Sequence, residues 1–591
     1  MTEIDSTIKD KSIEKQKSAY SIYERKVHNN NKDKKDEKVL PLVLPVFKEL
    51  EQVDLQVQHW EIKDWNALEQ RTHGPIFEAG GYQWRVQHEM VSVYLEVVVD
   101  NKKVEGEEWS VCGQFAVVIS HPDDPKHFFT NSAHHRFCED EIDWGFTRYH
   151  DIKTLQGGKE GYINQQNQTV ISIFLRVVKD ETGVLWHNLR NYDSRKETGY
   201  VGIRNQGATC YMNSLIQSLY FTNIFRKAVY GIPTEKEDPT NSVALALQRC
   251  FNNLQYCDES VGTTELTKSF GWDSLDAFMQ HDVQEFSRVL QDNLELKMKG
   301  TKVDGAVTNI FMGKMKSYIK CINVDYESSR VEDFYGCKTL QDSFRRYVDK
   351  ETMDGENKYM AEGFGLQDAW KGVSFESFPP VLHLQLKRFE YDMQRDTMIK
   401  INDHHVFPDR INLNEFCSKP CEDPTEYDYV LHGVLVHSGD IDGGHYFALL
   451  KPEKDGKWFR FDDDRVTPVT LREVFDDNYG DDPLRPANIN DDDPKTLVTD
   501  DQLRCTSARA LKRFTNAYML VYFQQNKIDE ILAPVKEEEI PKHLNKSLKD
   551  NAKALKDDQI NALISTQQPA KQKHIQLKKM EKSAEKKCIV M

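Results

Sequence analysis

The strongest chemical signal in the sequence is a cysteine at the predicted start of a helix. In NQGATCYMNSLIQSLYFTN, Thr209 is predicted to cap a helix that begins near Cys210, and apolar residues follow at helical spacing. The positive end of a helix dipole lowers the pKa of a cysteine in the first turn and enriches its thiolate. Asn205 lies on the preceding turn, where its side-chain N–H is placed to stabilise an oxyanion. For this segment alone, a buried and inert cysteine remains the alternative.

A histidine and an aspartate much later in the chain supply the groups that such a thiolate needs. LVHSGDIDGGHYFALL leaves one predicted strand, crosses a glycine-rich loop and enters the next strand at His445. Gly443 and Gly444 lack a Cβ atom, so the backbone there can approach a substrate closely. Asp462 ends the next predicted strand, KWFRFD, where it is placed to orient the imidazole. A helix-start cysteine with histidine and aspartate on adjacent strands is the papain-like arrangement.

Two regions of different patterning must position these residues. VSVYLEVVVD, QFAVVISH and TVISIFLRVV are predicted strands separated by turn-prone clusters, which predicts a β-sandwich over 55–180. Over 199–524 a helical half precedes the strand-like segments VLHLQL, YVLHGVLVH, HYFALLK, KWFRFD and NAYMLVYF, an α+β order. The alternative is a single large domain that joins both regions.

The predicted helical half contains the segment WDSLDAFMQHDVQEFSRVLQDNLELKMKG. It predicts a helix capped by Asp273 that ends before Gly300. Residues 1–54 include the run NNNKDKKDEK and are predicted to form a disordered arm, and residues 525–591 a polar, lysine-rich tail. The candidate catalytic residues therefore all belong to the region 199–524.

The composition restricts the class of protein. The 591 residues are 39% hydrophobic and 29% charged, as in soluble globular proteins, and the net charge of −17 disfavours general binding to nucleic-acid phosphates. The segment MTEIDSTIKDKSIEKQK lacks the apolar core of a secretory signal. Eleven widely spaced cysteines suit free thiols in a reducing compartment. We therefore expect an intracellular protein of the cytoplasm and nucleus.

The motifs together resemble the ubiquitin-specific protease family across essentially all of 199–524. GIRNQGATCYMNSLIQSL resembles its Cys box, and HGVLVHSGDIDGGHYFALL with KWFRFDDDRV and NAYMLVYF resembles its His box. FGWDSLDAFMQHDVQEFSRVLQDNLE and PPVLHLQLKRFEYD extend the match, and the region from QVQHWEIKDW to EIDWGFTRYHDI resembles a MATH (TRAF-like) sandwich. This pairing resembles the herpesvirus-associated subgroup. It implies a thumb, palm and fingers, and hydrolysis of the isopeptide bond after the terminal glycine of ubiquitin through a thioester acyl-enzyme.

The resemblance also implies roles for individual residues at the matching positions. Cys210 would be the nucleophile, His445 the base, Asp462 its orienting carboxylate and Asn205 an oxyanion donor. The channel for the ubiquitin tail would be lined by Asp282, Arg388, Phe389 and Tyr446. The tail carries arginines, so a carboxylate contact there would be strong.

In the sandwich, Asp143, Trp144 and Gly145 match the family's groove for short substrate peptides. The subgroup's earlier groove arginine has no counterpart at a matching position, and Trp144 as an ordinary core residue is the alternative. In the protease region, FGW at 270–272 resembles a loop that holds the site misaligned until ubiquitin binds, which predicts a resting enzyme of low activity.

Two features depart from the family's pattern. Many members bind a structural zinc ion through two CxxC pairs, whereas this sequence offers isolated Cys321 and Cys337 and the single pair Cys417–Cys421. Four thiolates at zinc-binding spacing are missing, so we expect no metal and no other cofactor. The subgroup continues into ubiquitin-like domains that promote activity. Here we expect that activation to be absent or supplied by another protein.

The sequence ends in a pattern that the family does not predict. Cys588-Ile-Val-Met has the form of a prenylation signal whose terminal methionine directs farnesyl. Residues 571–591 hold seven lysines and two glutamates, a local net charge of 7 − 2 = +5. A lipid beside a polybasic stretch can hold a membrane stably, so membrane association through this tail is expected. A chance cysteine on a disordered tail is the alternative.

Three functions are compatible with these observations. The first is a deubiquitinating enzyme that selects substrates with its sandwich and acts on ubiquitinated proteins. The second is a catalytically silent ubiquitin-binding adaptor, which the presence of every expected reactive residue disfavours. The third is a cysteine protease for another ubiquitin-like modifier, which Asp282 disfavours because that acid suits the arginine-bearing tail of ubiquitin.

Overall fold

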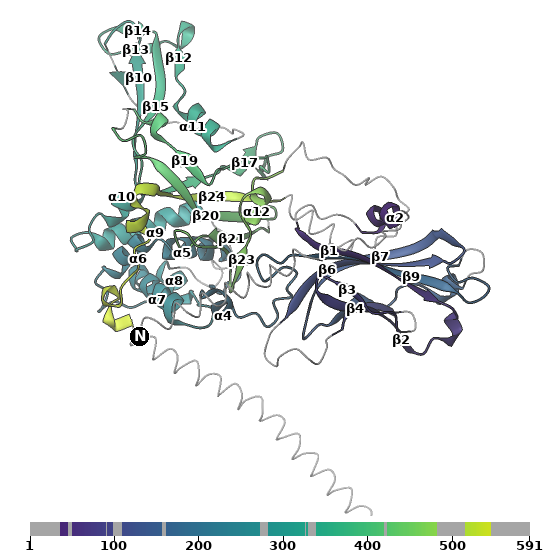
Figure 1. The fold of residues 1–591 in the computed structure, drawn as a ribbon. Helices are drawn as coiled ribbons and strands as arrows, with labels where there is room; N and C mark the ends of the chain where they lie inside the picture. Colours follow the sequence, from purple (N-terminus) through teal and green to yellow (C-terminus); the bar gives the residue numbers. More distant parts are fainter. Residues whose placement is uncertain are drawn as a thin grey trace, which may run out of the picture. The chain divides into compact units, whose positions relative to one another are not determined.

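The computed structural model describes most of the chain in two compact units, Met1–Leu189 and Arg190–Met591 (Figure 1). The described residues are 36–44, 50–89, 92–98, 109–156, 161–271, 282–325, 327–328, 339–418, 422–441, 443–481 and 514–544.

The first unit is a sandwich of two antiparallel sheets, as predicted. One sheet has the order β1 (Gln52–Ile62), β9 (Thr169–Val178), β6 (Ser110–His121), β7 (Asp124–Cys138). The other has the order β2 (Arg71–His73), β4 (Tyr82–Glu89), β5 (Ser92–Val97), β8 (Asp143–Phe146), with β3 (Phe77–Ala79) beside β4. A short helix, α3 (Ile152–Leu155), follows β8. Its core contains the fully buried side chains of Trp84, Leu95, Phe115, Phe137 and Ile173.

The prediction of a disordered arm over 1–54 is wrong for its last part. Residues Asp36–Val43 form helix α2, and β1 already begins at Gln52. Val43 and Leu44 are buried against Val118 and Phe174 of the sandwich. The apolar run VLPLVL can bury enough surface to offset the entropy of ordering.

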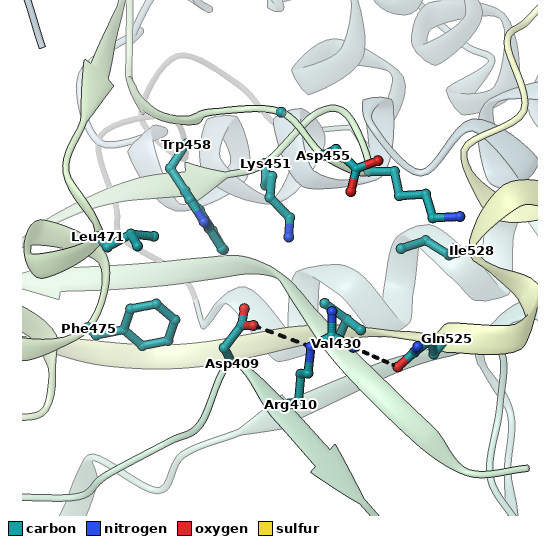
Figure 2. A pocket seen from close by; sticks show the side chains of 12 residues that line it. Asp409, Arg410, Val430, Lys451, Asp455, Trp458, Leu471, Phe475, Gln525 and Ile528 are labelled. Carbon is teal, nitrogen blue, oxygen red and sulfur yellow. Dashed lines mark hydrogen bonds and ion pairs between the residues drawn. The ribbon is translucent and has the colours of Figure 1, made fainter. Parts of the chain in front are cut away.

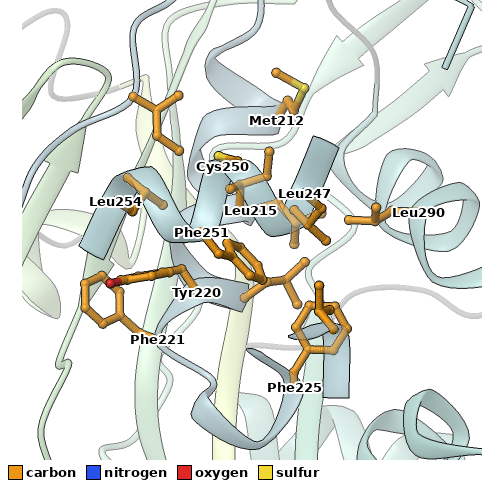
Figure 3. Close-up of a cluster of buried hydrophobic side chains, with 14 of the residues drawn as sticks. Met212, Leu215, Tyr220, Phe221, Phe225, Leu247, Cys250, Phe251, Leu254 and Leu290 are labelled. Atoms are coloured by element: carbon orange, nitrogen blue, oxygen red, sulfur yellow. The ribbon is translucent and has the colours of Figure 1, made fainter. Parts of the chain in front are cut away.

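The second unit begins with a helical lobe. Its helices are α4 (Ser194–Thr198), α5 (Cys210–Tyr220), α6 (Asn223–Tyr230), α7 (Val243–Tyr256), α8 (Thr264–Ser269), α9 (Val283–Met298) and α10 (Ala306–Phe311). Their apolar faces meet in one core (Figure 3), where Leu215, Phe225, Phe251 and Leu290 are fully buried. Every residue of α5 is buried, so this central helix is packed on all sides.

Helix α9 starts later than the sequence pattern predicts. The helix begins at Val283, and Asp282 is its N-cap, with side-chain Oδ1 accepting from the backbone N–H groups of Gln284 and Glu285. The extended backbone of Asp282 breaks the predicted continuous helix, and Asp273 lies outside the described residues. The side chain of Asp282 accepts hydrogen bonds from N–H groups that have no partner within the helix. This capping is why Asp is favoured just before a helix and less favoured inside one.

A seven-stranded sheet follows the helical lobe, which confirms the α+β order. Its strands run β16 (Val381–Gln385), β24 (Thr515–Gln524), β20 (Asp428–Ser438), β21 (His445–Leu450), β22 (Trp458–Asp462), β23 (Arg465–Val469), and β19 (Arg410–Asn412) pairs with β20. Alternate residues of β24 serve two cores: Val521 packs with the helical lobe and Leu520 with the opposite face. The sheet is therefore apolar on both faces, which makes it a rigid support.

Smaller elements project from this sheet (Figure 1). A second sheet has the order β11 (Glu327–Ser328), β10 (Lys314–Cys321), β15 (Ala369–Ser377), β12 (Glu351–Met353), with the hairpin β13 (Tyr359–Ala361) and β14 (Gly365–Gln367) nearby. The hairpin β17 (Phe389–Asp392) and β18 (Thr397–Lys400) and the helices α11 (Leu340–Val348) and α12 (Leu471–Val474) complete the unit. This helical lobe, central sheet and projecting sheet correspond to the expected thumb, palm and fingers.

The predicted polar tail is ordered at its beginning. After β24 the chain forms α14 (Ile528–Ile531) and continues in described structure to Leu544. Ile528, Ile531, Ile540 and Leu544 are buried in the core of the helical lobe. Packed structure therefore continues for twenty residues beyond the predicted boundary at 524, because these four apolar side chains anchor them. Among the described residues, no helix combines the length and apolar character that crossing a membrane requires.

Candidate active site

The central sheet and helix α5 bring the predicted nucleophile, base and acid together. Cys210 is the first residue of α5, as the sequence predicts, although the Thr209 side chain makes no capping hydrogen bond. The Cys210 side chain is buried. His445 is the first residue of β21, and Asp462 is the last residue of β22, with which β21 pairs. The two strands hold the imidazole between the carboxylate and the thiol.

The imidazole of His445 contacts both of its predicted partners. Its Nε2 atom lies 2.6 Å from Asp462 Oδ1, which leaves the other ring nitrogen for the thiol. Hydrogen bonds to Asp462 and then to Cys210 raise the pKa of His445 to about 10, against the opposing effect of burial. Burial also raises the pKa of Asp462, but the hydrogen bond from His445 and the charge of Arg460 bring it below its ordinary value. This arrangement stabilises an imidazolium between the carboxylate of Asp462 and the sulfur of Cys210.

The glycine before His445 permits a close approach between two strands. A Cβ atom on Gly444 would lie 1.9 Å from Nε2 of His437, a buried histidine on β20. No side chain fits in that space, so the Gly-Gly-His pattern has a packing reason as well as a role in substrate access.

Asp463 is a site residue that the sequence reasoning missed. Its Oδ2 atom accepts a hydrogen bond from Asn205 Nδ2 at 2.9 Å, and its Oδ1 atom accepts one from Asn213 Nδ2 at 2.8 Å. Asn205 Oδ1 in turn accepts from the backbone N–H groups of Gly207 and Thr209. The Asn205 amide is thereby fixed with its NH₂ group facing Asp463, and its role as an oxyanion donor stays a prediction. The three consecutive aspartates of FDDD were the only signal in the sequence.

The backbone of Asp463 is held as firmly as its side chain. It has a positive φ of 49°, and its carbonyl accepts from the N–H of Ile203 at 2.7 Å. A Cβ atom on Gly202 would lie 2.2 Å from that carbonyl oxygen, so glycine is required beside it. The segment before α5 is therefore fastened to the end of β22.

Three of the four predicted ubiquitin-tail residues surround one tyrosine. The hydroxyl group of Tyr518 on β24 donates to Asp282 Oδ2 and accepts from Gln385 Nε2 at 2.6 Å. The rings of Phe389 and Tyr446 lie 5.8 and 5.6 Å from the Tyr518 ring. Tyr518 belongs to the motif NAYMLVYF, and the sequence predicts no role for it. It joins the acid at the start of α9 to the aromatic wall of the predicted channel.

Arg388, the fourth predicted residue, uses its guanidinium differently. Its N–H groups donate to the backbone carbonyls of Ala517, Asp403 and Tyr479 at 3.2, 2.6 and 3.2 Å. The side chain is buried, and burial lowers the pKa of Arg388 to about 10. Here it ties three segments together, so its contact with the ubiquitin tail stays a prediction.

The predicted peptide groove of the sandwich lies on β8. Trp144 is 43% exposed and stacks on His135 with ring centroids 4.1 Å apart, so the alternative of an ordinary core residue is wrong. Burial, followed by the charge of Glu96, raises the pKa of Asp143. A Cβ atom on Gly145 would lie 2.2 Å from the carbonyl oxygen of Val93, so this glycine lets β8 pair closely with β5.

One cluster of potential metal ligands occurs among the described residues. Ligand atoms of His445, Asp462 and Asp463 lie within 4.8 Å of one another. All three groups are hydrogen-bonded within the protein, and the set does not fit a four-ligand structural zinc site. Cys321 is buried and Cys417 is half-buried, and Cys337 and Cys421 lie outside the described residues. The expectation of no metal stays a prediction.

A pocket in the same unit lies away from these groups (Figure 2). Lys451, Trp458, Arg410, Leu471, Phe475 and Ile528 are among its lining residues. Ser438 lies beside His445 at one end of the β20–β21 pair, whereas Gly433 and Leu450, next to the pocket, lie at the other. The pocket therefore does not serve the cysteine chemistry. Trp272 and Cys588 lie outside the described residues, so the predictions of a misaligning loop and of lipidation stay open.

Comparison with known proteins agrees with this geometry. The family model described as "Ubiquitin carboxyl-terminal hydrolase" matches residues 201–522, and a MATH domain model matches residues 62–182. The chain is 50% identical over 529 residues to ubiquitin carboxyl-terminal hydrolase 15 of Schizosaccharomyces pombe, covering 83% of this chain and 45% of that relative. It is 47% identical to ubiquitin carboxyl-terminal hydrolase 15 of Saccharomyces cerevisiae, covering 88% and 44%, and 46% identical to ubiquitin carboxyl-terminal hydrolase 7 of Drosophila melanogaster, covering 72% and 35%.

The chain spans less than half the length of these curated relatives. The match nevertheless includes the whole arrangement of Cys210, His445 and Asp462 together with the sandwich. The chain belongs to the ubiquitin carboxyl-terminal hydrolase family, in its MATH-domain-containing subgroup.

Proposed function

We propose that this chain is a deubiquitinating cysteine protease that hydrolyses the isopeptide bond at the C-terminal glycine of ubiquitin. The observation that carries the proposal is the position of His445, bonded to Asp462 on one side and to Cys210 on the other, within the family's matched region. An adaptor that only binds ubiquitin has no need for this arrangement, so the geometry favours the enzyme.

Cleavage follows from the roles of the three groups. The Cys210 thiolate attacks the glycine carbonyl, and the carbon–sulfur bond forms as the carbonyl oxygen becomes an oxyanion. The backbone N–H of Cys210, at the first turn of α5, and the free N–H of Asn205 stabilise that oxyanion. The tetrahedral intermediate collapses to a thioester, and the His445 imidazolium gives its proton to the leaving lysine amine.

Release of ubiquitin uses the same groups in reverse roles. Neutral His445 takes a proton from a water molecule, which attacks the thioester carbonyl. The thiol leaves as thiolate, the carboxylate of ubiquitin is released, and the proton on His445 restores the starting ion pair. Asp462 keeps the imidazole oriented throughout.

The partners follow from the two units. Asp282, at the edge of the aromatic cluster around Tyr518, supplies a carboxylate for an arginine of the ubiquitin tail, which favours ubiquitin over modifiers that lack one. Exposed Trp144 beside Asp143 supports selection of substrates through short peptide motifs. Residence in the cytoplasm and nucleus, and farnesylation of Cys588 with membrane association, rest on the sequence alone. The intact mass of the protein purified from eukaryotic cells shows whether it carries the farnesyl group.

The decisive experiment uses ubiquitin with a thiol-reactive group at its C-terminus, read by intact mass. We expect one adduct on the wild type and none on C210A. A folded wild type that binds ubiquitin without forming the adduct would support the adaptor function. A parallel reaction with a ubiquitin-like modifier that lacks the tail arginine should be slower, and a faster one would support the rival protease.

A further inference from the structure

The carboxylate of Asp462 has two oxygen atoms with different partners. Oδ1 bonds to His445, whereas Oδ2 accepts two hydrogen bonds from Arg460, at 2.9 Å from Nε and 2.5 Å from Nη2. Both donors converge on the single oxygen Oδ2, and these charge-assisted hydrogen bonds restrain the position of that oxygen. Arg460 therefore fixes the direction in which Oδ1 faces the imidazole.

The sheet places Arg460 for this contact. Arg460 and Asp462 are two residues apart on β22, so their side chains leave the same face of the strand. On the neighbouring strand, the ring of Phe447 lies under the guanidinium, with 3.8 Å between Cζ and the ring centroid. Phe447 is itself buried in the second core of the sheet. The guanidinium is thus held from below by an aromatic ring and from the side by the carboxylate.

The charge of Arg460 also reaches the imidazole through Asp462. It lowers the pKa of Asp462 and offsets part of the negative potential that this carboxylate imposes on His445. His445 is faced by Cys210 from α5, His437 from β20, and Asp462 and Asp463 at the end of β22. Among these groups Asp462 is the one that pairs with Arg460, so a change at Arg460 acts on the imidazole through Asp462.

We infer that Arg460 is a positioning residue of the active site, which orients Asp462 and limits the proton affinity of His445. The inference rests on the proposed function, because it assigns a fourth member to the same chemical relay. The alternative is an ordinary half-exposed ion pair, which would contribute little to stability and nothing to the reaction.

Three variants of the full chain separate these possibilities. R460M removes both the charge and the paired N–H donors. R460K keeps the charge but lacks the two adjacent N–H donors of the guanidinium. K454M removes a cation that pairs with Asp529 elsewhere on the surface. Each is assayed from pH 5 to 11 with ubiquitin that carries a fluorogenic amide on its terminal glycine. The assay gives kcat and KM separately.

We expect R460M to lower kcat about tenfold, a part of the roughly 100- to 10,000-fold that a positioned acid–base group contributes. KM should stay within about twofold, because Arg460 is not among the predicted tail contacts. The alkaline limb of kcat should move to higher pH, since loss of a nearby cation makes the imidazolium harder to deprotonate. R460K should keep the wild-type alkaline limb with an intermediate kcat, and K454M should match the wild type.

The remaining outcomes each contradict the inference. If R460M matches the wild type in kcat and in its alkaline limb, Arg460 is an ordinary surface ion pair. If kcat falls while the limb stays in place and the thermal midpoint drops, the role is only structural. A wild type without Cys210-dependent hydrolysis overturns the proposed function together with the inference, whereas an active wild type with an unaffected R460M overturns the inference alone.

Discussion

The amide nitrogen of Asn205 donates a hydrogen bond to Asp463 Oδ2 at 2.9 Å, although 258 positions separate the two residues in the chain. The same carboxylate accepts from Asn213 one turn into α5. Burial raises the pKa of Asp463, and the hydrogen bonds from Asn213 and then Asn205 oppose that rise. One acid thus fixes the oxyanion donor and the nucleophile-bearing helix relative to the strand that carries Asp462.

The variant D463N should lower kcat about 10- to 100-fold with little change in KM. Its side-chain amide would present a donor to one of the two asparagine donors, so Asn205 would lose its fixed orientation toward the oxyanion. Asparagine tolerates the positive φ of this position, so the fold should be retained. Steady-state hydrolysis beside D464N, at a neighbouring acid, checks the prediction. An equal effect of both substitutions would contradict it.

The variant Y518F should raise KM for ubiquitin several-fold and leave kcat nearly unchanged. It removes the hydroxyl group that bonds to Asp282 and Gln385 and so loosens the acid predicted to bind the tail. The matched control is Y522F on the same strand, whose hydroxyl group donates to the carbonyl of Pro408 at 2.6 Å. The control should lose about 1 kcal/mol of stability and no affinity. If Y518F and the wild type have equal KM values, Tyr518 does not contribute to the predicted channel for the ubiquitin tail.

The variant K400M should loosen the loop that carries His445. Lys400 Nζ donates to the backbone carbonyls of His437, Gly439 and Phe514 at 3.2, 2.8 and 2.5 Å. The carbonyls of His437 and Gly439 lie where β20 enters the loop before β21, and that of Phe514 lies just before β24. Loss of these hydrogen bonds should lower kcat and cost about 1–3 kcal/mol of stability. Limited proteolysis should cut the variant faster between 439 and 444.

The control for Lys400 is K358M, which removes a half-exposed lysine paired with Asp368 on the projecting sheet. It should change neither proteolysis nor kcat. If K400M is cut no faster than K358M, Lys400 does not hold the loop.

Acid should destabilise the protease unit through its buried histidines. Burial lowers the pKa of His383 to about 4 and the pKa of His432 to about 3, the latter aided by Lys451. The unfolded chain takes up protons below about pH 6.5, while the folded chain does not until its lowered pKa is reached, so stability falls as the pH drops from 6.5 toward 4. Each pKa unit corresponds to about 1.4 kcal/mol. Urea unfolding at pH 7.5 and pH 5 measures the loss of stability. The variant H432Q should reduce the slope of the free energy of unfolding against pH.

The catalytic histidine contributes the opposite dependence. Its folded pKa is raised to about 10, so its contribution to stability is fully present below about pH 6.5 and is lost as the pH rises to about 10. The variant D462N removes the largest cause of that shift. It should flatten the alkaline fall in stability and abolish hydrolysis. If the stability of D462N falls with rising pH as steeply as that of the wild type, His445 and Asp462 do not form the ion pair.

Much of the fold could be predicted from local patterns. The sandwich, the helix at Cys210 and five strands of the central sheet lie where alternating or helical apolar spacing placed them. The errors lie where a few apolar residues dock onto a distant surface, as at Val43 before the sandwich and Ile540 after the sheet. Val43 lies in a short apolar run next to a lysine-rich segment, and the residues around Ile540 are polar. At both positions only the tertiary contact makes order favourable.

The sequence by itself determined which groups carry the chemistry: a cysteine at a helix start, a histidine after two glycines and an aspartate at a strand end. These are residue types in local contexts, which a chain displays without folding. The tertiary structure alone decided the second layer, in which Asp463 fixes Asn205, Tyr518 contacts Asp282, and Arg460 binds the free oxygen of Asp462. Side-chain hydrogen bonds depend on distances of a few tenths of an ångström between segments far apart in sequence, and only the packed sheet and helix set those distances.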